Sequence, residues 1–164
     1  MSIKADVKRI HMIKRDPRVD VLPEMIHLLR KHLDNELFLS IGLKVAAQLF
    51  EDHGKRMAVL LINFEMHLVI ATSLKQHLDS RSMTAKALEC MAFCMHHVSH
   101  VCAPAFNKLG VLQTILEAVE KHDTDSAVQL RCFQILTMFA KSAGQTLVSI
   151  LKVGLPTEVR RLNN

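Results

Sequence analysis

The chain has 164 residues, of which 49% are hydrophobic and 23% are charged, and it contains only 5 Gly and 4 Pro. This composition excludes a disordered chain and predicts a single domain with a continuous apolar core. Trp and Tyr are both absent, which argues against a nucleic-acid module that stacks bases on aromatic side chains.

The formal net charge of +5 is concentrated at the two ends of the chain. Residues 1–18 contain six Lys and Arg against two Asp, residues 152–164 contain three against one Glu, and the middle is close to neutral. Nonspecific phosphate binding needs several basic side chains on one surface. We therefore expect any association with nucleic acid to be weak.

Targeting and redox signals are also absent from the sequence. The N-terminus has no apolar signal-peptide core, and the longest apolar run, residues 57–64, is far shorter than the roughly 18 residues of a membrane span. The four Cys form no CxxC pair, and a chain of this size and apolar content needs no disulfide framework. We expect an intracellular protein, cytoplasmic rather than nuclear, without a membrane span.

The first predicted element is a basic helix over residues 4–15. Its charge would suit nucleic acid or an acidic membrane, but Val7, Ile10 and Ile13 have the spacing of a core-facing stripe. We interpret residues 1–19 as a solvated terminal helix that forms a partial unit or cap.

A repeat of 45 residues occupies the rest of the chain. His32, His77 and His122 lie 45 residues apart, and in each copy a residue able to cap a helix follows three positions later. We expect each His to lie near the C-terminus of one helix, where a donating or cationic ring suits the exposed carbonyl groups. The predicted caps of the next helices are Asn35, Ser80 and Asp125.

Each cap precedes a long helix, predicted at residues 37–50, 82–95 and 127–140, then a loop and a shorter helix. The last two units end at Gly110 and Gly154, because Gly readily takes the left-handed conformation that stops a helix. Two positions depart from the pattern: Glu65 replaces a boundary Gly, and Gly42 replaces an Ala-like helix residue at a cost of roughly 1 kcal/mol. The predicted units are 20–64, 65–109 and 110–154, with 155–164 starting another.

Residues 108–142 carry a helix-ending Gly, an apolar helix, an Asp-bearing turn and an Ala/Leu-rich helix, and this segment resembles an armadillo repeat. The resemblance implies an all-α, armadillo-like right-handed helical-repeat solenoid of about three units. Armadillo proteins are mostly binding scaffolds, so it also implies a protein–protein interaction module that binds a peptide or helix along its concave surface. The phase of the repeat at both ends fits either a piece of a longer protein or short caps, and self-association through the solenoid ends is a further expectation.

The candidate partner-binding residues are the outward positions of the three long helices. Import receptors of the armadillo family use Trp and Asn there, and neither occurs at these positions in this chain. The alternatives are ordinary solvated positions on these helices, or a HEAT-like nucleic-acid-binding domain. The residues are Lys44, Gln48, Glu89, Phe93, Gln134 and Met138, with Phe93 expected to face solvent.

Metal binding and catalysis are weaker hypotheses. Helical spacing puts Cys90, Cys94 and His97 on one face, which suits zinc, but both Cys align with apolar residues of the other units and are interpreted as core. No recognisable catalytic motif occurs, and the nearest constellation, residues 51–53 (Glu-Asp-His), is expected to form a solvated turn. A metal-binding protein remains a minor alternative, and we expect neither a cofactor nor enzyme activity.

Overall fold

The computed structural model of the chain describes residues 2–15 and 19–142. Within these ranges the chain is all-helical and has no strand, which confirms the predicted all-α class. Seven α-helices and one 3-10 turn, η1, are described there. They are α1 (Ile3–Arg15), η1 (Val19–Val21), α2 (Leu22–Lys31), α3 (Glu36–Asn63), α4 (Met66–Gln76), α5 (Arg81–Lys108), α6 (Val111–Lys121) and α7 (Ser126–Ser142).

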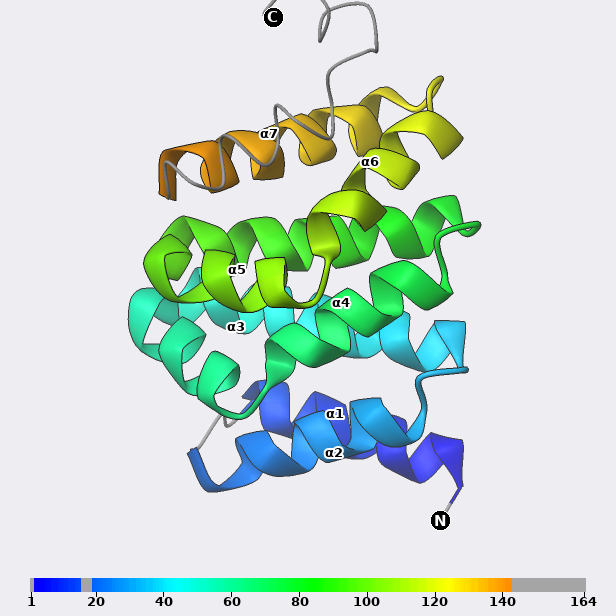
Figure 1. Ribbon diagram of the computed structural model, residues 1–164. Coiled ribbons are helices and arrows are strands. Elements are labelled where there is room, and N and C mark those ends of the chain that lie inside the picture. The colour runs from blue at the N-terminus through cyan, green and yellow to red at the C-terminus, as the bar shows by residue number, and fades with distance from the viewer. Residues whose placement is uncertain (1, 16–18, 143–164) are drawn as a thin grey trace, which may run out of the picture.

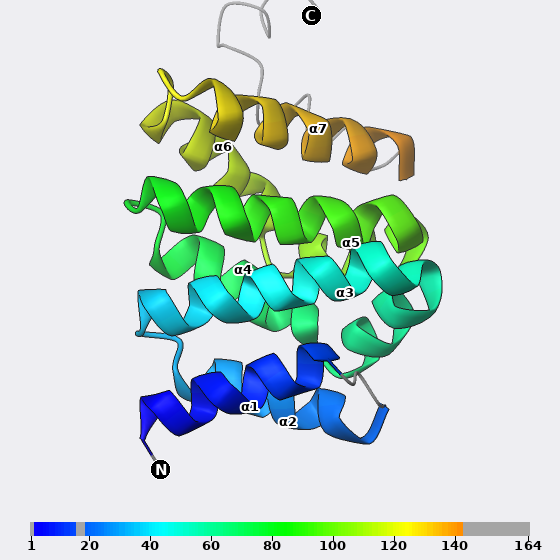
Figure 2. The ribbon, with the colours of Figure 1, turned by 180° about the vertical axis from the view of Figure 1, so that it is seen from behind.

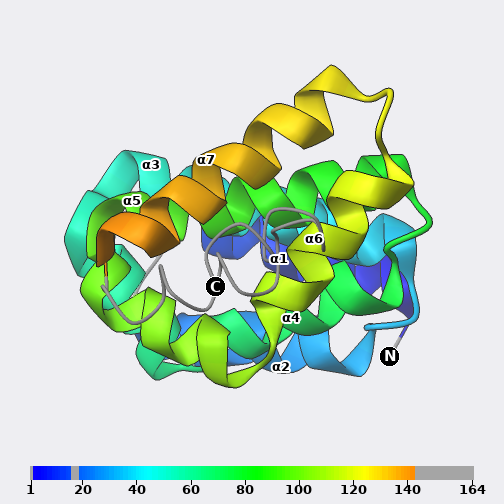
Figure 3. The same cartoon turned by 45° about the horizontal axis from the view of Figure 1, so that its top comes forward.

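The helices stack in two rows (Figure 1). Helices α1, α3, α5 and α7 follow one another in the first row and run in the same direction (Figure 2). Helices α2, α4 and α6 form the second row on the other side of the stack (Figure 3). The most extensive contacts join α5 to its two row neighbours, α3 and α7, and to α4. Each turn of the chain therefore adds one helix to each row.

The loop that we expected after each of the first two long helices is a single-residue kink, and the loop expected after the third lies outside the described residues. Helices α3 and α5 each contain 28 residues, with non-helical dihedrals only at Gly54 (φ 57°, ψ −141°) and Val98 (φ −143°, ψ 46°). Residues 51–53, expected in a turn, consequently lie within α3. Gly54 lacks a side chain that would oppose a positive φ, which allows the chain to turn at this one residue.

The predicted turns between the two rows are confirmed in all three copies. His32, His77 and His122 are the C-terminal caps of α2, α4 and α6, and each backbone carbonyl accepts from the N–H of the residue three positions later, at 2.9–3.0 Å. That residue then caps the next helix through its side chain. Asn35 accepts from Phe38 N at 2.9 Å, Ser80 from Met83 N at 3.4 Å, and Asp125 from Ala127 N and Val128 N at 2.9 and 3.1 Å.

The repeated histidines also bind one unit to the next. His77 Nε2–H donates to the carbonyl of Leu33 at 2.7 Å, and His122 Nε2–H donates to the carbonyl of Leu78 at 2.8 Å. His32 has no earlier turn beside it and instead donates to the buried carboxylate of Asp6 on α1, at 2.8 Å. Each His therefore lies at a helix end, as expected. Its ring also makes a contact that was not expected, with the preceding unit or with α1.

The residues at the start of α4 and α6 share a left-handed backbone. Gly110 has φ 70° and Glu65 has φ 67°, so Glu65 adopts the conformation that the repeat assigns to Gly. A side chain with Cβ is strained in this region. The Glu65 carboxylate receives an exposed hydrogen bond from Arg30 of α2 at 2.6 Å. Gly154, the other predicted boundary, lies outside the described residues.

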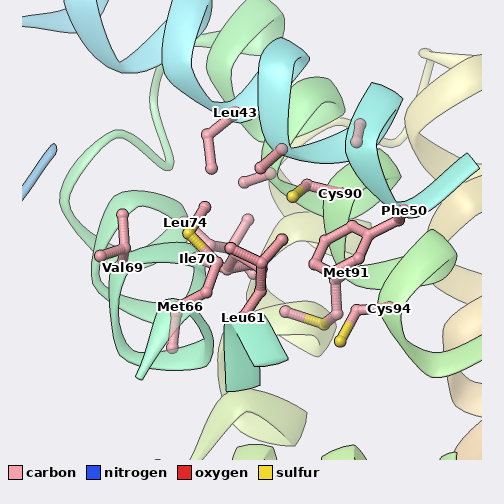
Figure 4. Packing of buried hydrophobic residues seen from close by; sticks show 14 of the residues in the cluster. Leu43, Phe50, Leu61, Met66, Val69, Ile70, Leu74, Cys90, Met91 and Cys94 are labelled. Carbon is pink, nitrogen blue, oxygen red and sulfur yellow. The ribbon is translucent and has the colours of Figure 1, made fainter. Parts of the chain in front are cut away.

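One apolar cluster runs through the stack. In its centre, residues of α3, α4 and α5 converge, among them Leu43, Ile70 and Met91 (Figure 4). The terminal helix joins the cluster through Ile10 and Ile13, as predicted. Gly42 lies where α3 meets α2: a Cβ at this position would lie 2.0 Å from Leu29 Cδ2. Gly42 is unfavourable inside a helix, and the close packing of α2 against α3 explains why Gly occupies this position.

Candidate functional site

The six predicted partner-binding residues occupy one strip across the first row of helices. Lys44 and Gln48 lie on α3, Glu89 and Phe93 on α5, and Gln134 and Met138 on α7. The three helices are neighbours that run in the same direction (Figure 2), so the strip repeats the same two positions on each. We call these six residues the rung strip.

The burial of the rung strip is mixed. Lys44 and Gln134 are exposed, whereas the other four residues are half-buried. Phe93 and Met138 pack against the apolar core. The expectation that Phe93 faces solvent is therefore wrong, because the residue is shared between the core and the surface. Helix α5 also kinks at Val98, five residues after Phe93, and the repeat alignment did not predict this kink.

Polar contacts connect the strip to its surroundings. Glu89 on α5 lies 3.6 Å from the guanidinium of Arg131 on α7, and Arg131 donates to Gln134 Oε1 at 3.1 Å. On α3, the Gln48 amide donates to Asp52 Oδ1 at 2.9 Å. Lys44 makes no ion pair with a described residue. The strip thus offers one unpaired cation, two amides and a compensated carboxylate.

Exposed apolar side chains extend the same row, and the sequence analysis did not single them out. Leu37 on α3 is 73% exposed, and on α7 Leu130 is 69% and Phe133 56% exposed. The repeat aligns Phe133 with Leu43 and Leu88, which are fully buried. Phe133 lies on α7, and no described helix follows α7 in the first row. This position at the end of the described row could have indicated that Phe133 is exposed.

The structure supports the interpretation of the cysteine-rich segment as core. Cys90 and Cys94 are fully buried, and Cys94 Sγ lies 2.9 Å from Cys102 Sγ across the kink of α5. Burial raises the pKa of the Cys90 thiol, and the contact with Cys102 together with burial raises that of Cys94. These shifts are typical of thiols that pack as small apolar groups in a core. Within the described ranges, no group of three or more His, Cys, Asp or Glu is arranged to hold a metal ion.

The weak catalytic candidate is not assembled either. Glu51, Asp52 and His53 are consecutive exposed residues of α3, so their side chains point in different directions. The two carboxylates that are buried within the described residues, Asp6 and Asp125, have structural partners instead. Asp125 caps α7, and the backbone N–H of Val128 is the main cause of its lowered pKa, while hydrogen bonds from His32 and then Lys31 lower that of Asp6.

A second surface competes with the rung strip. A shallow hollow of about 360 Å³ lies between α4 and α6, in the second row of helices. Thr72, Lys75 and Gln76 of α4 and Thr114 of α6 contribute to its lining, together with apolar residues. Among the described residues of its lining there is a single cation and no carboxylate, so they have less chemical variety than the rung strip.

No single helix in the described part of the chain has the length and apolar composition of a membrane span; α3 and α4 reach them only together, across a bend of 79°. Comparison with known protein families, with curated proteins and with solved structures gave no match to this chain.

Proposed function

We propose that this chain is an armadillo-like, right-handed solenoid that serves as a protein–protein interaction module, and that it binds a peptide or helix along the rung strip. The observation that supports the proposal is the register of α3, α5 and α7, in which the same two repeat positions recur on three neighbouring helices of one row. Helical-repeat proteins use such rows as extended binding surfaces. The role of a scaffold needs no catalytic group, and the proposal assigns none.

The spacing of the row limits the length of the ligand. Packed helices lie about 8–10 Å apart, so the distance from α3 to α7 is roughly 16–20 Å. An extended chain rises about 3.3 Å per residue, and about five or six residues therefore cross the strip. A helix would cover the same distance with about three turns.

The chemistry of the strip limits the composition of the ligand. The amides of Gln48 and Gln134 can pair with the backbone of an extended peptide, and the half-buried Phe93 and Met138 can receive an apolar side chain. Because Glu89 is paired with Arg131, the middle of the strip has little net charge. We therefore expect a short peptide of mixed composition with one central apolar residue.

The runner-up, a HEAT-like nucleic-acid-binding domain, has less support from the strip. Phosphate binding needs several uncompensated cations on one surface, whereas the strip has a single unpaired cation, Lys44, and contains the carboxylate of Glu89.

The test is selection of peptides from a random library on the folded chain, followed by affinity measurements with two matched double variants. Lys44→Glu with Gln134→Arg changes the strip at exposed positions. Lys75→Glu with Gln113→Arg makes the same changes at exposed positions of the second row. We expect the first variant to weaken the selected peptides at least about tenfold and the second to leave them unchanged.

Two outcomes would reject the proposal. If only the second variant loses the peptides, the hollow between α4 and α6 is the binding surface. If selection yields no peptide that competes for the strip, the row is not a peptide-binding surface. Circular dichroism of both variants would show that the fold is retained.

A further inference from the structure

Three exposed cations and one histidine lie on the outer face of α1. Lys4, Lys8, His11 and Arg15 follow one another at spacings of four, three and four residues, which places them on one side of the helix. This side lies opposite the buried stripe of Asp6, Ile10 and Ile13. The four side chains are exposed and cover a length of about 16 Å. We call these four residues the α1 basic face.

No exposed carboxylate of α1 neutralises this face. The one acidic residue of the helix, Asp6, is fully buried and is bound by Lys31 at 3.0 Å and by His32. Glu24 of α2 is paired with Arg9 at 2.7 Å. Lys4, Lys8, Lys14 and Arg15 make no ion pair with any residue of the described ranges. The exposed surface of α1 therefore carries cations and no carboxylate.

An exposed apolar side chain lies at the border of the basic face. Met12 is 58% exposed and lies four residues after Lys8 and three before Arg15, so it borders this side of the helix. The face thus combines cations with an exposed apolar side chain.

We propose that the α1 basic face is a docking surface for an anionic lipid membrane. Each Lys or Arg near such a membrane strengthens binding, and exposed apolar side chains at the same surface add to it by entering the headgroup region. Nucleic acid fits less well, because Met12 gains nothing from a phosphate backbone and α1 contains no Phe, Tyr or Trp on which a base could stack. Helix α1 lies at the end of its row, so a flat surface can approach it while the rung strip remains free (Figure 2).

The test uses sedimentation of the full chain with vesicles of phosphatidylcholine, with and without about 30% phosphatidylserine. We expect binding only to the anionic vesicles at about 0.15 M salt and its loss near 1 M salt, since the Debye length falls from about 8 to 3 Å. Lys8→Gln with Arg15→Gln should reduce the partition coefficient about 30-fold. Met12→Ser should reduce it at least about threefold.

A matched control variant carries the same substitutions elsewhere. Lys55→Gln with Arg56→Gln removes one Lys and one Arg at exposed positions of α3, so its net charge equals that of the first variant. It should bind like the original chain. Equal loss in both double variants, absence of binding to anionic vesicles, or an unchanged Met12→Ser variant would each overturn the proposal. Salt-sensitive binding to a duplex oligonucleotide that exceeds binding to the vesicles would assign the face to nucleic acid instead.

Discussion

The substitution Gly42→Ala separates local helix propensity from tertiary packing. Ala is about 1 kcal/mol more favourable than Gly inside a helix, so the sequence of α3 alone predicts that the variant is more stable. In the structure a Cβ at position 42 would lie 2.0 Å from Leu29 Cδ2 and 3.1 Å from Leu29 Cγ. Leu29 is fully buried, so its side chain has little room to move.

The magnitude follows from these two opposing effects. Overpacking of a filled core costs typically about 1–3 kcal/mol, which exceeds the propensity gain. We expect a net loss of about 1 kcal/mol, equivalent to a decrease of roughly 2–4 °C in the melting temperature of a chain of this length. Of the three units, only the first has Gly at this position. The pair Leu29 and Gly42 corresponds to Leu74 and Ala87 in the second unit and to Val119 and Cys132 in the third.

The assay is urea unfolding followed by circular dichroism, because the chain has no Trp for fluorescence. Leu29→Val should make room for the new methyl group, so Gly42→Ala should be stabilising in that background by up to about 1 kcal/mol. The double-mutant cycle would then give a coupling of about 1–2 kcal/mol. A higher urea midpoint for Gly42→Ala alone would refute the close approach of α2 and α3.

Four further predictions concern other parts of the fold. Glu65→Gly should raise stability by roughly 0.5–1 kcal/mol, because Gly relieves the left-handed strain and the exposed pair with α2 contributes little; a lower melting temperature would contradict this. His77→Ala should cost about 1–3 kcal/mol, since it leaves a carbonyl of the previous unit unpaired, and His77→Gln should recover part of this loss in urea titrations. Phe93→Ala should lower the melting temperature by about 4–8 °C, as expected for roughly 2 kcal/mol at a half-buried site; a change below about 2 °C would restore the solvent-facing interpretation. Asp6 is stabilised as the carboxylate, chiefly by the hydrogen bond from His32, and its folded pKa is lowered, so this stabilisation is complete above its ordinary pKa of 3.8 and is lost as the pH falls below that value. Unfolding measured from pH 6 to pH 3 should therefore show a shallower acid loss for Asp6→Asn than for the original chain, and identical slopes would reject this role.

The local architecture was readable from the amino-acid order alone. Helix caps and turns depend on groups within four residues of one another, so the recurrence of His and a capping residue three positions later was enough to predict the turns at Asn35, Ser80 and Asp125. The apolar period likewise predicted which side of α1 is buried, through Ile10 and Ile13. The alignment of the repeat also placed the six residues of the rung strip on neighbouring helices of one row.

Contacts between residues far apart in the sequence were decided by the tertiary structure. The hydrogen bonds from His77 and His122 reach carbonyl groups 44 residues earlier, and no local pattern specifies such a partner. The same is true of the burial of Phe93, which depends on how the core meets α5, and of the requirement for Gly42, which depends on how closely α2 approaches α3. Local hydrogen bonding and periodicity define each helix, whereas the exposure of its side chains depends on the neighbours that the stack brings to it.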